Sequence, residues 1–259
     1  MNYMNLSLAW MGALNMALAL YGCTNGIETG LSAPEGIPVT VLAEISPVTK
    51  SGEAVSSDNG FDRTSFLSGD QIKVTRTKKA SGTAASQSAS YRYDGTSAWT
   101  VVGTSPVTLE PAVTYSAQFP ADYSAINQFQ TTSAAYLASN LLKTGDATSS
   151  DGMLDFTSSG KPFTHVNSKL TLMFTVKRET SIANDAVTVA ATGIRTAVST
   201  NQTITLYRPY PGDASRKYEW CGILRAVGGS AGTSATDLTV SLTCDGVTYK
   251  ATLTGCALR

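Results

Sequence analysis

The chain has a single histidine, His165, and this limits the chemistry that its side chains can perform. Nucleophilic catalysis needs a nucleophile, a base and a group that orients the base. The Gly-x-Ser-x-Gly pattern occurs once, at Gly228-Gly229-Ser230-Ala231-Gly232, in a run that we interpret as a flexible loop and not as the strand-to-helix turn that presents a nucleophile. We therefore interpret His165, at the start of a predicted strand, as a structural hydrogen-bonding group, and we expect no enzyme activity. Turnover abolished by changing His165 would overturn this interpretation.

The cysteines and acidic residues give no clear metal site. Cys221, Cys244 and Cys256 lack the close pair that zinc sites use, and the acidic loop from Asp146 to Asp151 lacks the spaced oxygen ligands of a calcium loop. We expect no cofactor and no metal. An odd number of cysteines cannot all pair within one chain, so disulfides involving Cys221 and three buried thiols remain alternatives.

An apolar segment near the N-terminus predicts export. Leu6 through Tyr21 is apolar except for Ser7 and Asn15, and sixteen residues are too few for the ~20 of a comfortable membrane span. The segment ends in Gly22-Cys23, which resembles a bacterial lipobox, so residues 1–22 are a predicted signal peptide and Cys23 a predicted lipidation site. Residues 1–5 lack the basic residues of such signals. The alternatives are a cleaved signal with an unmodified cysteine, or a buried strand.

Composition favours β-structure and disfavours nucleic acid as a partner. Charged residues make up 15% of the 259 residues, against roughly 25% in an average soluble protein, and the chain is rich in Thr, which strands prefer. Nineteen basic residues balance nineteen acidic ones, so no basic surface is available for a phosphate backbone. The Gly-, Thr-, Asn- and Pro-containing residues 23–36 predict a tether, with folding beginning near Ile37.

Alternating apolar residues predict a series of short strands. The predicted strands are 39–45, 72–74, 91–93, 107–119, 170–176, 186–190 and 203–207, and residues 80–90 are a predicted polar loop. One segment, 134–142, has apolar residues at helical spacing but is long enough for only one or two turns.

The last element is the best specified. A two-residue Asp245-Gly246 turn joins two strands, and it pairs Leu238 with Leu253, Val240 with Ala251, Leu242 with Tyr249 and Cys244 with Val247. Every apolar pair then falls on one face. The same register places Cys256 opposite Ala235, about 30 Å from Cys244 at ~3.3 Å per residue. A disulfide between these two cysteines is therefore not expected.

An ordered set of motifs resembles the fimbrillin family, the pilin-like lipoproteins of certain Gram-negative anaerobes. The set begins with the lipobox and ends with the Asp245-Gly246-x-x-Tyr249 hairpin, so the resemblance covers roughly residues 20–258. Between them lie Phe66-x-x-Gly69-Asp70-x-Ile72-x-Val74, Tyr93-Asp94-Gly95 with Trp99, Phe119-Pro120, Asn140-Leu141-Leu142, and Phe163-Thr164-His165-Val166-Asn167-Ser168-Lys169-Leu170.

The resemblance implies an all-β fold with two tandem transthyretin-like β-sandwich domains after a lipoprotein signal peptide. Residues 37–160 would form the N-terminal sandwich and residues 161–259 the C-terminal one. It also implies a lipid-anchored outer-membrane subunit of a fimbria or pilus, which is cut by an arginine-specific protease and assembles with other fimbrial subunits by β-strand exchange. Arg63, the first arginine, is the candidate processing site; an ordinary loop arginine is the alternative.

Two departures from the family limit what the resemblance implies. This chain stops at Arg259, whereas family members continue past the Leu253 region into a strand that can be donated. This favours a tip or accessory subunit over a bulk stalk subunit, or else a truncated product. The acidic run that often follows the lipidated cysteine is also absent. The alternative function is a surface lipoprotein that binds glycans through Trp99, Trp220 and Tyr218, although these aromatic residues also suit the core or its rim.

Overall fold

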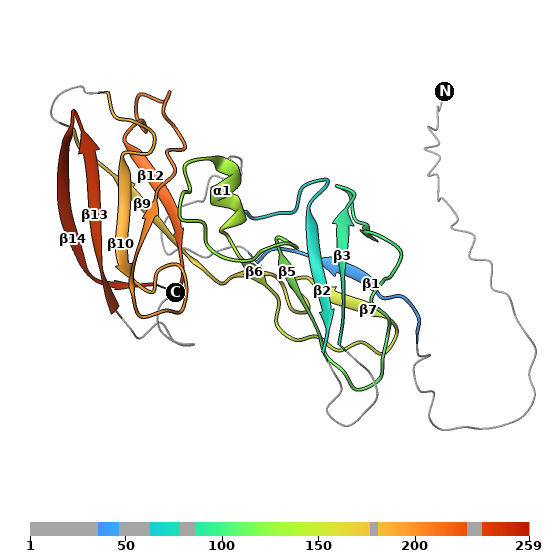
Figure 1. Cartoon of the computed structure of the whole chain (residues 1–259). Helices are drawn as coiled ribbons and strands as arrows, with labels where there is room; N and C mark the ends of the chain where they lie inside the picture. The colour runs from blue at the N-terminus through green and yellow to red at the C-terminus, as the bar shows by residue number, and fades with distance from the viewer. Residues whose placement is uncertain (1–35, 47–62, 78–85, 177–180, 227–234, 259) are drawn as a thin grey trace, which may run out of the picture. The chain divides into compact units, whose positions relative to one another are not determined.

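The computed structural model describes residues 36–46, 63–77, 86–176, 181–226 and 235–258, and their regular structure is almost entirely β (Figure 1). This confirms the predicted all-β fold class. The strands of the first half are β1 Thr40–Ala43, β2 Gln71–Arg76, β3 Gln87–Tyr93, β4 Trp99–Val101, β5 Tyr115–Phe119, β6 Leu142–Lys143, β7 Met153–Phe156 and β8 Thr164–His165. Those of the second half are β9 Ser168–Met173, β10 Val187–Thr192, β11 Asn201–Thr205, β12 Glu219–Leu224, β13 Ala235–Cys244 and β14 Val247–Ala257.

The first half packs a large sheet against a small one. The large sheet has the order β4-β3-β2-β5-β6-β8, and β1 pairs in parallel with β7 to form the small one. Strands β2 and β5 bury every second side chain, as expected for a sheet with one face on a core. At the centre of this core the ring of Phe66 packs edge-on against Trp99, Phe119 and Phe163, with centroids 5.0, 5.5 and 5.2 Å away.

The second half is built from a four-stranded sheet of order β11-β10-β13-β14 and a β9-β12 pair. All six residues of β12 are buried, and Trp220 on this strand is fully buried in the second core cluster. The indole N–H of Trp220 donates to the carbonyl of Asn184 at 3.1 Å, which satisfies its one polar atom.

A segment between β5 and β6 joins the second core. Ile126 belongs to that cluster, and residues 128–130 extend the four-stranded sheet, because Phe129 bridges in parallel to Thr205 of β11. The amide of Gln130 bonds main-chain atoms of Ile223 in both directions, at 2.8 and 2.7 Å. Helix α1, Ser133–Ala138, follows with Thr132 as its N-cap and confirms the predicted short helix.

The C-terminal hairpin confirms the predicted register for all four apolar pairs. The extrapolation beyond them was wrong, because Thr236, and not Ala235, pairs with Cys256. The register shifts where Gly255 adopts a φ of +67°, and its N–H donates to the Asp237 carboxylate at 2.9 Å. A β-bulge with glycine in the left-handed region explains the shift.

The remaining strand predictions were largely confirmed, with two errors. Of the predicted strand 107–119, only Tyr115–Phe119 is a strand, and residues 107–114 form a loop with a single bridge from Thr108 to Pro38. Residues 87–90, predicted as loop, belong to β3. The division after residue 160 stays a prediction, as do the signal peptide, residues 1–22, and most of the tether, which lie outside the described residues. No helix within the described ranges is long and apolar enough to span a membrane.

Candidate assembly site

The segment around β1, near the N-terminal end of the described chain, contributes side chains to the first core. Val39, Val41 and Ile45 are 5%, 1% and 4% exposed and belong to the first core cluster. They alternate with outward-facing residues such as Leu42, which is 37% exposed. The alternation predicted from the sequence is therefore what directs this segment into the core.

The main chain of this segment has partners on two sides. From Thr40 to Ala43 it lies parallel to β7 (Figure 1), and the N–H of Thr40 donates to the carbonyl of Gly152 at 2.8 Å. Just before β1, the N–H of Val39 donates to the carbonyl of Val107 at 2.9 Å. Residues 36–46 thus occupy a slot between β7 and residues 107–109.

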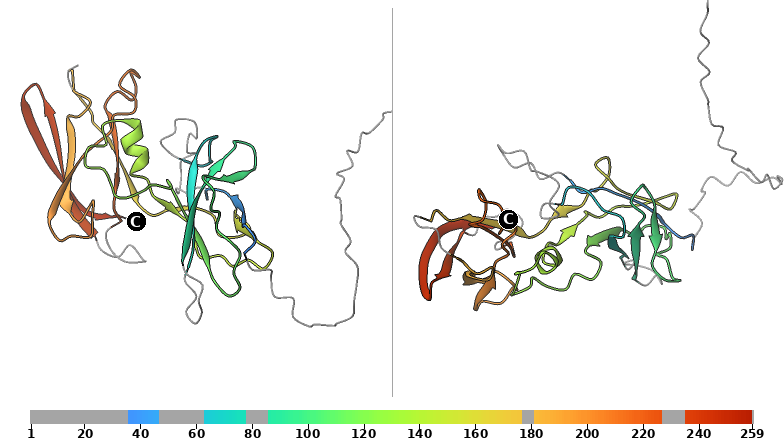
Figure 2. Two further views of the ribbon diagram at one scale, coloured as in Figure 1. Left: turned by 45° about the vertical axis from the view of Figure 1, so that its right-hand side comes forward. Right: turned by 90° about the horizontal axis from the view of Figure 1, so that it is seen from above.

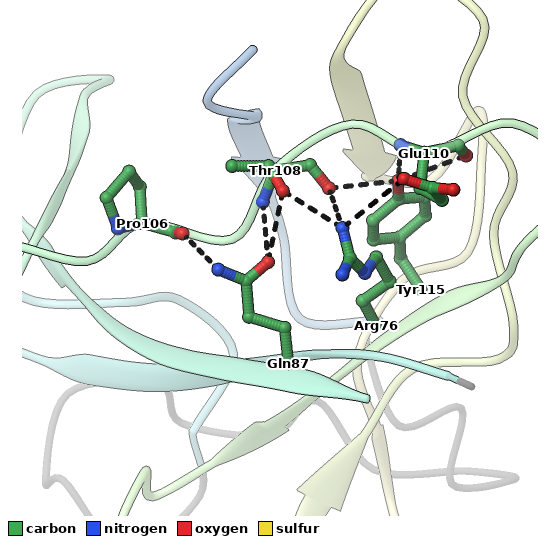
Figure 3. Close-up of polar contacts among 6 residues, drawn as sticks. All are labelled: Arg76, Gln87, Pro106, Thr108, Glu110 and Tyr115. Carbon is green, nitrogen blue, oxygen red and sulfur yellow. Dashed lines mark hydrogen bonds and ion pairs between the residues drawn. The ribbon is translucent and has the colours of Figure 1, made fainter. Parts of the chain in front are cut away.

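The wall formed by residues 106–110 is held by side chains that do not come from β1 (Figure 3). The amide group of Gln87 donates to the carbonyl of Pro106 at 2.8 Å and accepts from the N–H of Thr108 at 3.0 Å. The N–H of Val107 donates to the Tyr91 hydroxyl at 3.1 Å. Strand β3 therefore fixes this wall from one direction.

Residues Arg76 and Tyr115 fix the same wall from β2 and β5. The guanidinium of Arg76 donates to the carbonyl and hydroxyl of Thr108 at 3.1 and 2.9 Å, and its charge lies 4.0 Å from the Glu110 carboxylate. The Tyr115 hydroxyl accepts from the N–H of Glu110 at 2.8 Å. Burial raises the pKa of Tyr115, so this hydroxyl stays neutral well above physiological pH.

These contacts hold the wall from a side that β1 does not supply, in addition to the main-chain bonds between residues 36–39 and 107–109. The contacts described for residues 106–110 in Figure 3 all lie within the large sheet and the wall itself. Its opposite side, β7, carries the fully buried Leu154 and Phe156. If β1 left, an apolar groove with unpaired main-chain groups along both walls would remain.

The candidate processing residue Arg63 is held in place by two contacts. Its guanidinium forms an ion pair with Asp70 and lies 5.1 Å from the centroid of the Phe119 ring. The side chain is 13% exposed, and Asp70 also accepts from the N–H of Leu67 at 2.8 Å. A protease that must bind this side chain cannot reach it until both contacts open.

A pocket of about 550 Å³ adjoins Arg63. Its lining includes Asp70, Lys73, Phe119 and Asp122. Because these residues carry charges of both signs, they favour neither an anionic nor a cationic ligand. We therefore assign no ligand to this pocket.

The other sequence-predicted residues lie away from this site or outside the described chain. Cys23 falls among residues that the structure does not describe. His165 lies on β8, and its ring Nδ1–H donates to Asn140 Oδ1 at 2.9 Å. Trp99 and Trp220 are 8% and 0% exposed, so both anchor cores. Tyr218 packs partly buried on the second core.

The cysteine and metal predictions can be compared with the described part of the chain. There, no disulfide joins Cys221, Cys244 or Cys256, and no group of three or more His, Cys, Asp or Glu residues is placed to hold a metal ion.

Sequence reasoning missed the residues that build the wall. Gln87 fell in a predicted loop, and Arg76 lies beyond the predicted strand 72–74. A signal was present for Tyr91 and Tyr115 only, because buried tyrosines need a hydrogen-bond partner for the hydroxyl.

Comparisons with known proteins identify solved structures of similar fold. A fimbrial protein from Bacteroides ovatus matches with a TM-score of 0.41 and 14% identity over 87% of this chain and 46% of that chain. Candidate cell adhesion proteins from Bacteroides fragilis and Parabacteroides distasonis match with TM-scores of 0.47 and 0.46 and identities of 16% and 11%. The Bacteroides fragilis match covers 86% of this chain and 89% of the other. The Parabacteroides distasonis match covers 84% of this chain and 80% of the other.

These neighbours are of the kind that the fimbrillin resemblance implies. The chain spans about half the length of the Bacteroides ovatus protein. No protein-family model and no curated protein matches the chain. At these TM-scores and identities the likeness is one of fold, and the roles of residues here rest on the geometry above.

Proposed function

We propose that this chain is a fimbrillin-like structural and adhesive subunit of a cell-surface fimbria, assembled by β-strand exchange at the slot that β1 fills. One observation carries the proposal: β1 is buried in the first core, yet it precedes Arg63 in the chain. A cut at Arg63 would break the covalent connection between β1 and the rest of that core, so that β1 would be held by non-covalent contacts alone.

The energetics make the cut consequential. Burying a Val or Ile side chain stabilises a fold by about 1.5–3 kcal/mol, so the three side chains of this segment contribute roughly 5–9 kcal/mol. Whole domains are stable by only about 5–15 kcal/mol. A cut subunit that loses β1 therefore needs another strand in its place.

The strand that refills the slot is defined by the slot itself. It must be extended, present apolar residues at every second position, and pair with β7 and with residues 107–109. A strand from a neighbouring subunit would supply this segment and would pack against the wall that the side chains in Figure 3 hold.

The contacts of Arg63 add a control step to the proposal. Because Asp70 and Phe119 hold this side chain, cutting requires a local opening of the segment that carries it. The uncut subunit then stays closed during export, and assembly begins only after the protease acts.

The proposed location follows from the N-terminal segment. Lipidation of Cys23 after removal of residues 1–22 would hold the chain on the outer membrane, with other fimbrial subunits as partners. Host or bacterial surface ligands would be bound from the assembled fimbria.

The test is cleavage of the full chain by an arginine-specific protease, followed by N-terminal sequencing and size analysis. The proposal predicts a new N-terminus at Thr64 and the appearance of oligomers. Arg63→Lys keeps the positive charge beside Asp70 but removes the protease site, so it should block both results. Arg92→Lys, an exposed β3 arginine, is the matched control and should block neither.

A chain cut at Arg63 that stays monomeric would contradict strand exchange. Glycan binding by the uncut chain on an array would then favour the alternative of a glycan-binding lipoprotein.

A further inference from the structure

Strand β14 forms a long free edge in the second half of the molecule. It has 11 residues, Val247–Ala257, and in the described part of the chain it pairs only with β13. All of its residues are exposed except Leu253 and Cys256, which are half-buried. In Figures 1 and 2 the red hairpin forms the outer edge of its sheet in every view.

This edge differs from the edges of the other large sheet and from the opposite edge of its own sheet. The six-stranded sheet ends in β4 and β8, which are three and two residues long. On the other side of the four-stranded sheet, residues 128–130 cover β11. Proteins protect long edges with charges, prolines or short strands. Strand β14 carries one charged residue, Lys250, and no proline.

The register of the hairpin determines which main-chain groups face outward. In a hairpin with a two-residue turn, the residues that flank the turn form a hydrogen-bonded pair, here Cys244 and Val247. The N–H of Thr243 donates away from β14, to Ala186 of the β10 side, at 2.9 Å. The even-numbered residues of β14 therefore direct their N–H and C=O groups to the free edge.

The core-side face of this edge is apolar and incompletely covered. Val247 and Tyr249 are 51% and 59% exposed, although they lie on the same face as the buried Leu238 and Val240. A strand that pairs with this edge would gain main-chain bonds and would also cover these two side chains.

We propose that β14 pairs antiparallel with β14 of a second copy of this chain, with Ala251 at the two-fold axis. This register places Tyr249 opposite Leu253 of the second copy and Lys250 opposite Thr252 of the second copy. Apolar side chains thus meet on one face, and the single charge faces a hydroxyl. The pairing needs no cleavage at Arg63, so it is independent of strand exchange at β1.

Other centres for the two-fold axis are worse. Centring on Lys250 opposes two like charges. Centring on Tyr249 brings the Asp245-Gly246 turn into the paired stretch and shortens it. Centring on Thr252 places Tyr249 opposite Gly255, where the bulge disrupts the ladder.

Cysteine cross-linking of the uncut full chain tests this register. Ala251 forms a non-hydrogen-bonded pair with itself, in which the Cα atoms lie about 4.5 Å apart, within disulfide range. Ala251→Cys should therefore give a reducible dimer under mild oxidation. In the neighbouring Thr252→Cys variant the two Cα atoms lie about 8–9 Å apart, beyond that range.

We expect about tenfold more dimer for Ala251→Cys than for Thr252→Cys, because only the first pair has disulfide geometry. The parent chain, with its natural cysteines, gives the background. Equal cross-linking of the two variants, or none above background for Ala251→Cys, would overturn the proposal.

A proline substitution provides a second test that does not depend on thiols. Lys250→Pro removes an outward N–H and leaves the β13–β14 bonds intact, as an edge strand tolerates. Added to Ala251→Cys, it should abolish the dimer without lowering the unfolding temperature, whereas Lys250→Thr should keep it. A dimer that survives Lys250→Pro would contradict pairing through this edge.

Discussion

Strands β1 and β14 are both peripheral in sequence, but they are held in opposite ways. The segment 36–46, which contains the four-residue strand β1, has partners on two sides, and its core side chains are at most 5% exposed. Strand β14 has 11 residues, a mostly exposed surface and, among the described residues, one partner strand. The short strand is therefore anchored by side chains, and the long one by main-chain bonds to a single neighbour.

The difference shows how a strand can serve in assembly. A strand such as β1, which fills a core, must be removed before another strand can bind, so its use requires a trigger. A strand such as β14 has a free edge and can pair as it stands. The two sites would therefore respond differently to substitution, protease and pH.

The largest expected effect is the difference in stability loss when a charge is placed on the buried strand β1 and on the exposed strand β14. Val41→Asp places a charge in the first core and should destabilise the fold by about 4 kcal/mol. Tyr249→Asp on the exposed strand should change stability by no more than about 0.5 kcal/mol. Urea unfolding of both variants measures the difference, and equal losses would show that β1 is no better anchored than β14.

The next effect concerns the wall of the β1 slot. Gln87→Ala leaves the carbonyl of Pro106 and the N–H of Thr108 without their partner, and we expect a loss of about 1–3 kcal/mol. Gln118→Ala, which removes one 3.3 Å bond to Ala121, is the matched control. If both variants unfold at the same urea concentration, the wall does not depend on Gln87.

A smaller effect is expected on the rate of cutting at Arg63. Asp70→Asn removes the charge that holds the guanidinium. If the free energy needed to open the segment around Arg63 falls by about 1 kcal/mol, cleavage should become roughly fivefold faster. The appearance of the Thr64 N-terminus over time measures this rate. An unchanged rate would mean that the ion pair does not limit access of the protease.

The smallest effect is a dependence on alkaline pH. Burial raises the pKa of Tyr91 and of Tyr115 above 10.0 in the folded chain. Stability is then constant below pH 10 and falls above it, because the unfolded chain loses protons first. Tyr91→Phe should flatten this fall and cost about 1 kcal/mol at neutral pH through the lost bond to Val107. An equally steep fall in this variant would contradict the assignment.

The sequence was sufficient where the pattern is local. The Asp245-Gly246 turn and alternating residues predicted the register of the C-terminal hairpin, and periodicity predicted β1 and the short helix. The bulge at Gly255 was missed, because an alternating pattern does not contain an extra residue. The burial of Glu219 and Gly222 in β12 was missed because a charged residue and a glycine are not typical of a fully buried strand.

The assembly site depended on contacts distant in sequence. The pairing of β1 with β7 joins residues more than one hundred positions apart, and no local rule predicts a parallel pair of that kind. Gln87 and Arg76 support the wall only because the sheet brings them beside Thr108. The exposure of Tyr249 likewise follows from what the second core fails to cover.

The most direct test of the central claim is to lock β1 in its slot. Thr40 and Met153 are register partners on β1 and β7, and both are exposed. A Thr40→Cys, Met153→Cys double variant, cut at Arg63 under oxidising conditions, should stay monomeric and then form oligomers when the disulfide is reduced. Each single variant should form oligomers under both conditions. Oligomers of the cut, oxidised double variant would contradict the claim that assembly requires β1 to leave.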